Sequence, residues 1–188
     1  AMSDSNGYIV DENGIDYQVM QEIKEVKRAR IKTYLDYVPT AKYVEGYRGI
    51  WNVPCDIALP CATQNELDVE DAVMIVANNV RYYVEAANMP ATAEALRLLR
   101  LSPKILTAGS KASGSGGVVV SALEMVQNSV RYSWTRQEVD SRLKQIMGDI
   151  YDASAAAAEE YGLGYDLIAG NDIAAFKKIS EAMIAQGL

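Results

Sequence analysis

Residues 55–67 read CDIALPCATQNEL, a mostly apolar segment followed by small and amide side chains. A proline bounds the apolar part on each side, which indicates a short strand from Cys55 to Leu59. In open α/β sheets, ligands bind beyond the carboxyl ends of the strands. The loop at residues 60–65 is therefore a candidate ligand site with uncharged hydrogen-bonding groups, although an ordinary structural loop fits the same spacing.

The segments that follow this stretch predict an α/β fold. Strands are expected at residues 81–86 and 105–108, and strands that alternate with helices through short loops are typical of parallel sheets. A second polar loop, residues 85–90, lies at the same sheet edge as the first, which strengthens both as ligand sites. Asp68 is placed to cap a helix that ends at Asn78, with an inward face of Val69, Ala72, Val73 and Val76.

The amino-terminal part carries weaker signals. Short strands are expected at residues 8–10 and 42–44. Asp16 is placed to cap a helix that runs toward Leu35. The face of this helix that meets the core is expected to contain Val19, Ile23 and Val26.

Beyond residue 132 the sequence is helical. Thr135-Arg136-Gln137-Glu138 matches a capping box at the start of one helix. We divide the single domain into an α/β part at about residues 1–132 and a helical tail at about residues 133–188. A last helix is expected to have an inner face of Ile173, Phe176, Ile179 and Met183.

Composition excludes several functions. The 188 residues carry a net charge of −7, which disfavours nucleic acid and other partners that need a basic surface. No apolar run approaches the roughly 18 residues of a membrane span. No histidine is present, which removes the Ser-His-Asp triad and most zinc sites, so no metal is expected. Cys55 and Cys61 are expected as free buried thiols of a cytoplasmic protein.

Two clusters have both a structural and a functional interpretation. Gly114-Ser115-Gly116-Gly117 is expected between a strand and a helix but lacks the G-x-G-x-x-G spacing of a dinucleotide turn. It serves either close helix–strand packing or a ligand carboxylate at the helix start. The basic cluster near the start is either a solvated face or a 2′-phosphate site; it consists of Lys24, Lys27, Arg28, Arg30 and Lys32.

The sequence resembles the hexameric bacterial glutamate dehydrogenases. The resemblance is strongest at residues 55–67 and continues in the order of that family through residues 87–90, 121–129 and 182–187. These further blocks read ANMP, SALEMVQNS and AMIAQG, and the resemblance covers essentially the whole chain.

The resemblance implies an incomplete Rossmann-like, doubly wound parallel sheet with a helical carboxy-terminal tail. The amino-terminal catalytic domain and the glycine fingerprint of the coenzyme domain are expected upstream. We therefore expect no catalytic residue in this chain and no activity of the chain alone. The intact enzyme would be a cytoplasmic homohexamer that converts L-glutamate, NAD(P)⁺ and water to 2-oxoglutarate, ammonia and NAD(P)H.

The resemblance also implies the roles of individual residues toward the coenzyme. Asp4 falls near the adenosine ribose, where a carboxylate can accept from a hydroxyl. Ala62, Thr63 and Gln64 match the loop along the coenzyme, and Asn88 matches an asparagine near the nicotinamide ribose.

For the substrate, Val118 and Ser121 match positions that line the pocket for the side chain of glutamate. Two departures weaken the match. Gly114 stands where the family has an asparagine associated with the nicotinamide, and Asn171-Asp172 stands where the family has Ala-Asn.

The choice between NAD and NADP stays open. Asp4 repels a 2′-phosphate and so favours NAD. Lys24, Lys27 and Arg30 match basic positions that NADP-using relatives employ. Tyrosine-rich and alanine-rich stretches are similar to the NAD-specific clostridial enzymes, and the balance slightly favours NAD.

The alternative is a naturally short, non-catalytic protein of the same fold that binds a dinucleotide or serves in assembly. In either case the incomplete sheet should leave an edge and apolar surface exposed, so self-association is expected.

Overall fold

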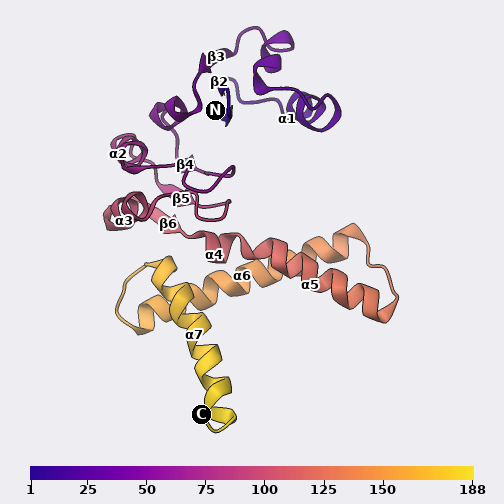
Figure 1. Ribbon diagram of the computed structural model, residues 1–188, viewed down its shortest axis with the longest axis vertical. Coiled ribbons are helices and arrows are strands. Elements are labelled where there is room, and N and C mark those ends of the chain that lie inside the picture. The colour runs from indigo at the N-terminus through magenta and orange to yellow at the C-terminus, as the bar shows by residue number, and fades with distance from the viewer.

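The computed structural model describes residues 1–188, which form three parts along the long axis of the molecule (Figure 1). An antiparallel sheet with short helices lies at the amino-terminal end. A parallel sheet with two helices follows, and a group of longer helices forms the other end. None of the helices is both long and apolar enough to cross a membrane.

The antiparallel sheet has the strand order β1–β2–β3. β1 and β2 form a hairpin around Ser5 and Asn6, in which the Asp4 carboxylate accepts a hydrogen bond from the Asn6 N–H at 2.9 Å. β3 pairs with the other side of β2. The bounds of the strands are β1 Met2–Asp4, β2 Gly7–Val10 and β3 Lys42–Glu45.

The helix expected from Asp16 to Leu35 is interrupted, so that prediction is wrong in length. Asp16 does cap its start, but Arg28 has a left-handed backbone (φ 50°) that no helix can continue through. Val26, expected in the core, is 69% exposed because it lies next to this break. The resulting elements are α1 Tyr17–Gln21, a π-helical segment Glu22–Val26 and a 3₁₀ helix Ile31–Asp36.

A small hydrophobic core stabilises the unit formed by the antiparallel sheet and its short helices. Tyr34 is fully buried, and its hydroxyl donates to the Asp11 carboxylate at 3.0 Å while it accepts from the Asp16 N–H at 2.8 Å. The core consists of Ile9, Met20, Ile23, Ile31, Tyr34 and Ala41.

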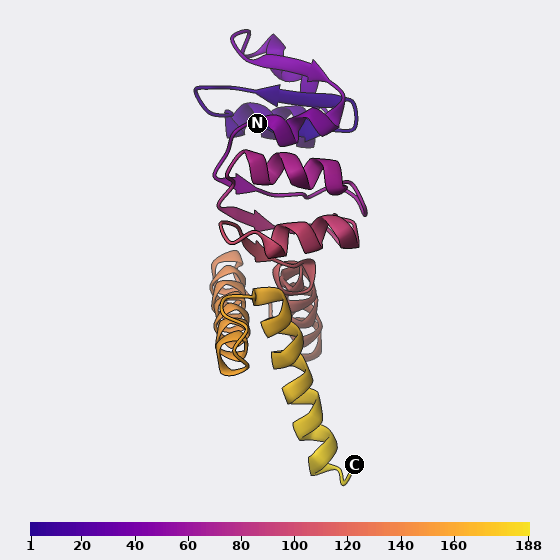
Figure 2. The ribbon, with the colours of Figure 1, turned by 90° about the vertical axis from the view of Figure 1, so that its left-hand side faces the viewer.

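The second sheet is parallel, with the order β4–β5–β6, and confirms the predicted α/β fold. Ala58 pairs with Tyr83, and Tyr83 pairs with Thr107. Two helices connect the three strands and lie side by side (Figure 2). A 3₁₀ helix, Tyr47–Asn52, leads into the sheet; the other bounds are β4 Ile57–Ala58, α2 Val69–Ala77, β5 Tyr82–Val84, α3 Ala93–Leu101 and β6 Leu106–Ala108.

The predicted inward face of α2 is partly wrong. Val69 and Val73 are 40% and 46% exposed, whereas Ala72 and Ile75 are buried. The carboxylate of Asp71 completes a capping box with Asp68, and this side chain also lies in the buried face. The buried face of α2 thus includes Asp71, Ala72 and Ile75, while Val69 and Val73 lie outside it. The larger core around the sheet consists of Ala58, Leu67, Ala72, Ile75, Val80, Tyr83, Ala91, Ala95, Leu99 and Ile105.

The glycine cluster at residues 114–117 lies partly inside a helix, which corrects the sequence prediction: Gly114 is in a turn, but Ser115, Gly116 and Gly117 are helical. β6 leads directly into one helical turn, and Gly114 separates this turn from a long helix. The capping box of Thr135 and Glu138 is confirmed. The bounds are α4 Ser110–Ser113, α5 Ser115–Val130, α6 Arg136–Glu160 and α7 Leu167–Ala185.

α6 and α7 cross at small residues. A Cβ atom added to Gly170 would lie 2.0 Å from the Ser154 carbonyl oxygen and 3.0 Å from the Cβ of Ala158, so the two backbones are in direct contact there. The Asp166 carboxylate caps α7 and also accepts a hydrogen bond from Arg100 at 2.6 Å, which ties α7 to α3.

Much apolar surface stays uncovered. Phe176, Ile179 and Met183, expected on the inner face of α7, are 66%, 58% and 45% exposed because no other part of this chain lies over them. The molecule exposes 12390 Å², whereas a compact chain of this size would expose about 8,900 Å². α5 and α7 thus present apolar faces to solvent.

The helix crossing gives a first prediction. Gly170→Ala should lower the free energy of unfolding by about 2 kcal/mol or more, because backbone atoms of α6 cannot move aside for the new methyl group. The measurement is urea unfolding followed by the helical circular dichroism signal.

Gly148→Ala is the matched control, since a Cβ at this position in α6 meets no atom within 4 Å. It should stabilise the chain by about 0.5–1 kcal/mol through helix propensity. Equal effects of the two substitutions would show that the crossing does not exclude a side chain.

Candidate functional site

The loops after β4 and β5 extend from the same edge of the parallel sheet (Figure 1). Together with the start of α5 they enclose a cleft of about 650 Å³. Three of the residues predicted to bind the coenzyme, Ala62, Gln64 and Asn88, lie in its wall. The remaining lining residues are Cys61, Ala86, Ala87 and Gly114.

Backbone hydrogen bonds hold the two loops to one another. The Ala86 N–H donates to the Pro60 carbonyl at 3.0 Å, directly beyond the paired strands. Farther out, the Asn65 N–H donates to the Met89 carbonyl at 3.0 Å. The Glu66 carboxylate closes the first loop by accepting from the Ala62 N–H at 3.0 Å. The wall of the cleft is therefore a built structure rather than two independent loops.

Both loops also contain a left-handed residue that is not glycine. Asn65 has φ 55° and Met89 has φ 51°. Asparagine adopts this conformation readily, whereas methionine does so at a cost of roughly 1–2 kcal/mol. Backbone strain of this kind concentrates at ligand sites, where the surrounding structure holds it in place.

The side chains of the cleft are uncharged. Gln64 and Asn88 supply amide donors and acceptors, and the other lining residues are small or apolar. Such a site suits a ligand region with hydroxyl or carboxamide groups, which it can bind without introducing a charge.

Both cysteines are exposed, so the expectation of buried thiols is wrong. The strand around residue 57 is only two residues long, and both cysteines lie in the irregular segments beside it. Partial burial, and then the nearby Glu66 carboxylate, raise the pKa of the Cys61 thiol. This cysteine lines the cleft, and its Sγ–H donates to the Leu59 carbonyl at 3.2 Å.

Asp4 lies in the antiparallel unit, none of whose residues lines the cleft. Its carboxylate accepts from the Asn6 and Ile31 N–H groups, both at 2.9 Å. Although burial raises the pKa of Asp4, these two donors and the Lys24 ammonium together hold it below its usual value. The structure thus gives this carboxylate a local role, which is to start the 3₁₀ helix that follows Arg28.

The three basic residues proposed for a 2′-phosphate divide into two groups. Lys24 and Arg30 lie beside Asp4: the Lys24 Nζ is 3.9 Å from its carboxylate, and the Arg30 guanidinium donates to the Ser5 hydroxyl at 2.8 Å. Lys27 instead donates to the Tyr37 hydroxyl and lies over its ring, with the Nζ 4.8 Å from the centroid. Each cation thus has an internal partner.

The remaining predicted residues lie outside the cleft wall. Thr63 is exposed in the first loop. Val118 and Ser121 lie on α5, where Val118 is 72% exposed and Ser121 is exposed too. These two are three positions apart and share one face of the helix with Met125. Within this chain nothing completes a pocket over that face.

The sequence placed Glu85 in the second polar loop but gave it no role of its own. Gly114 was noted as a departure from the family, yet it lines the cleft. Glu85 is 2% exposed directly after β5. A glutamate that follows an apolar strand without a break is the signal that could have identified it, because buried carboxylates need a specific set of donors.

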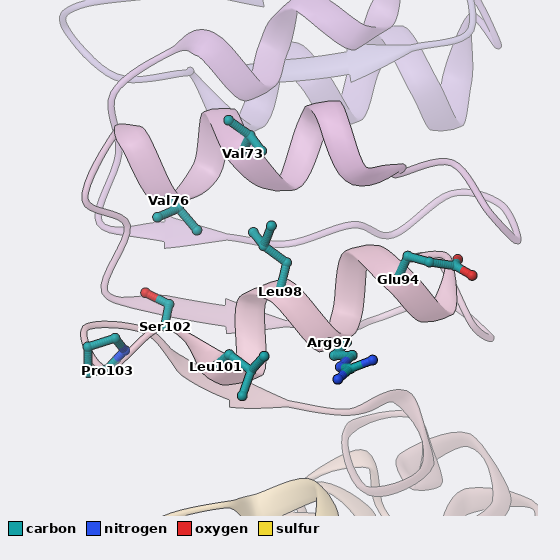
Figure 3. A pocket seen from close by; sticks show the side chains of 8 residues that line it. All are labelled: Val73, Val76, Glu94, Arg97, Leu98, Leu101, Ser102 and Pro103. Atoms are coloured by element: carbon teal, nitrogen blue, oxygen red, sulfur yellow. The ribbon is translucent and has the colours of Figure 1, made fainter.

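A second hollow lies on the outer surface of α2 and α3 (Figure 3). Val73 and Val76 of α2 and Leu98 and Leu101 of α3 line it, Val76 and Leu98 point into the space between the two helices, and the strands lie behind. Its volume is about 570 Å³. Because it lies on the helices rather than at the carboxyl ends of the strands, and because Glu94 and Arg97 bring charges to its lining, it does not match the uncharged ligand site expected beyond the strands.

The sequence matches the family Glutamate/Leucine/Phenylalanine/Valine dehydrogenase over residues 1–187. The chain belongs to this family. It is 50% identical to the NAD-specific glutamate dehydrogenase of Clostridium symbiosum and 44% identical to the NADP-specific glutamate dehydrogenase of Helicobacter pylori strain 26695. These alignments cover 100% and 99% of this chain, and 42% and 43% of the two relatives.

A solved structure of Plasmodium falciparum glutamate dehydrogenase 2 shares the fold, with a TM-score of 0.91 and 46% identity. The superposition covers 99% of this chain and 41% of that one. This member of the dehydrogenase family is thus Rossmann-like, and it spans about two fifths of the length of the glutamate dehydrogenases that it matches.

The surroundings of Asp4 give a prediction about acid stability. Because the folded-state pKa of Asp4 lies below its ordinary value of 3.8, its stabilising effect is present above that value and disappears as the pH falls through the folded pKa. Asp4→Asn should therefore lower the urea midpoint at about pH 7, and the difference from the unsubstituted chain should shrink toward about pH 3.

Asp152→Asn, at an exposed position in α6, is the control and should leave both midpoints unchanged. A pH-independent effect of Asp4→Asn would contradict the proposed electrostatic origin.

Proposed function

We propose that this chain supplies the coenzyme side of an NAD(P)-dependent glutamate dehydrogenase, and that the cleft beyond β4 and β5 receives the nicotinamide half of the dinucleotide. The observation that carries the proposal is the convergence of Ala62, Gln64 and Asn88, three residues carried over from the family, on one uncharged cleft at the carboxyl ends of parallel strands. The membership of the chain in the dehydrogenase family supports it.

The donors of the cleft fit such a ligand. A nicotinamide riboside has hydroxyl and carboxamide groups but no anionic group on its rings, and Gln64 and Asn88 can each donate and accept hydrogen bonds. The bound coenzyme would supply the hydride acceptor of the reaction. The residues of this chain would bind and orient it, since the loops that carry them are fixed to one another by backbone bonds.

In the proposed reaction of the whole enzyme, L-glutamate loses a hydride from its α-carbon to NAD(P)⁺. Water then adds to the resulting imine, and 2-oxoglutarate, ammonia and NAD(P)H leave. We assign no catalytic acid–base residue to this chain. The exposed face of α5 with Val118 and Ser121 is proposed to meet the side chain of glutamate once another part of the enzyme covers it.

We further propose a preference for NAD over NADP. The negative charge of Asp4 opposes a 2′-phosphate. Lys24, Lys27 and Arg30 already contact Asp4, Tyr37 and Ser5, so these cations would have to leave their partners to bind a phosphate. The whole enzyme is proposed to be a cytoplasmic homohexamer, on the basis of the resemblance to hexameric relatives.

The binding proposal is tested by titrating the chain with NADH and NADPH and following the nicotinamide fluorescence. NADH should bind, and more tightly than NADPH. Asn88→Ala should weaken NADH binding about three- to tenfold, as the loss of one hydrogen bond implies.

Asn128→Ala, at an exposed position in α5, is the matched control and should bind like the unsubstituted chain. Absence of NADH binding by the unsubstituted chain would overturn the proposal, and equal affinity for both coenzymes would overturn the preference.

The absence of catalytic residues is tested separately. The chain, incubated with L-glutamate and either NAD⁺ or NADP⁺, should form no reduced coenzyme, because no acid–base residue is assigned to it. A full-length glutamate dehydrogenase in a parallel reaction is the positive control. Glutamate-dependent formation of NADH or NADPH by the chain would contradict the assignment.

A further inference from the structure

Glu85 is the most buried carboxylate outside the predicted site residues. It directly follows β5 and is 2% exposed, yet no lysine or arginine forms an ion pair with it. One carboxylate oxygen accepts from the Tyr83 hydroxyl at 3.2 Å, and the other accepts from the Ser110 N–H at 3.0 Å. A buried carboxylate without a cationic partner is costly unless it accepts hydrogen bonds. The donors of Tyr83 and Ser110 therefore stabilise Glu85 in its buried position.

A second bond links the same residue to the other end of α4. The Ser113 hydroxyl donates to the Glu85 carbonyl, and also to the Gly109 carbonyl at 3.1 Å. Glu85 therefore contacts the first and the last residue of α4, which is a single turn of helix. A single turn is unstable by itself because helix nucleation is unfavourable. Its conformation must depend on bonds of this kind.

α4 ends at the cleft. A Cβ atom at Gly114 would lie 2.6 Å from the Ser110 carbonyl oxygen, so the bend between α4 and α5 is tight. Gly114 lines the cleft together with Ala86 and Asn88, which come just after Glu85 in the chain. Glu85 thus joins parts of the lining that come from different strand–helix connections.

We propose that Glu85 is a positioning residue for the cleft. Through its carboxylate and carbonyl it fixes α4, and therefore Gly114, at the distance from Ala86 and Asn88 that a bound nicotinamide requires. The inference rests on the proposed dinucleotide function. It assigns no contact between Glu85 and the ligand.

The test compares Glu85→Ala with Glu85→Gln. Alanine removes both carboxylate bonds. Glutamine can keep both, because its carbonyl oxygen can accept from the Ser110 N–H while its amide donates to the Tyr83 oxygen. Glu94→Ala, an exposed position on α3, is the matched control. Ser113→Ala, which removes the hydroxyl bond alone, provides a milder change in case Glu85→Ala does not fold.

Two readouts are needed. The first is the affinity for NADH, which should fall about tenfold in Glu85→Ala and less than about threefold in Glu85→Gln. The second is hydrogen exchange of the Gly114 amide, which donates to the Ser110 carbonyl at 2.8 Å, relative to the amide of Leu99 in the core. Exchange at Gly114 should accelerate in Glu85→Ala and Ser113→Ala while exchange at Leu99 stays unchanged.

The outcomes separate the inference from the proposed function. Weaker NADH binding together with faster Gly114 exchange in Glu85→Ala, both restored in Glu85→Gln, supports it. It is overturned if Gly114 exchange accelerates without loss of affinity, if affinity falls with exchange unchanged, or if glutamine behaves like alanine. If the unsubstituted chain binds no NADH, the proposed function fails as well; if that chain binds and Glu85→Ala binds equally, the inference alone fails.

Discussion

Parallel pairing of β5 with β4 on one side and β6 on the other is the constraint on which the cleft depends. The strands are short, but the register that pairs Ala58 with Tyr83 and Tyr83 with Thr107 places the ends of all three at one level. Backbone bonds then continue the pairing beyond the strands, from Ala86 to Pro60 and from Glu85 to Ala108. Connections far apart in sequence are thereby brought to within hydrogen-bonding distance, and small shifts in register would separate them.

The ordered cleft contrasts with the open surface of the helical part. β4, β5 and β6 share one core with α2 and α3, and the loops beyond the strands are bonded to one another. The long helices contact one another mainly at the crossing of α6 and α7, and they leave apolar faces on α5 and α7 in solvent. The chain that carries these exposed apolar faces spans about two fifths of the length of the relatives it matches.

The sequence predicted the parallel sheet, the capping box at Thr135, the cap at Asp68 and both loops of the cleft, because each depends on local signals. Apolar runs bounded by proline and side chains that cap helices act within a few residues. The sequence did not predict the features that depend on contacts between segments far apart in the chain. The helix after Asp16 is interrupted by the left-handed backbone at Arg28, and the next helical turn begins at Ile31, whose N–H donates to the carboxylate of Asp4 in another element.

The candidate site shows the same difference between local features, which the sequence reveals, and contacts between distant segments, which it does not. The two polar loops were expected at one edge of the sheet because both follow parallel strands, and Ala62, Gln64 and Asn88 from these loops line one cleft. The glycine cluster was expected between a strand and a helix, whereas α4 precedes Gly114 and the residues after Gly114 already belong to α5. Position along the chain could not show that Asp4, Lys24 and Arg30 form a group of their own.

The left-handed backbone at Met89 limits how this part of the cleft can vary between related proteins. An unbranched side chain can adopt φ 51° at a modest cost, and asparagine or glycine at a smaller one, but valine, isoleucine and threonine would clash with their own backbone. The backbone conformation thus restricts which residues can replace Met89, even though its side chain is 47% exposed. An exposed residue in this loop can therefore change as slowly as a buried one.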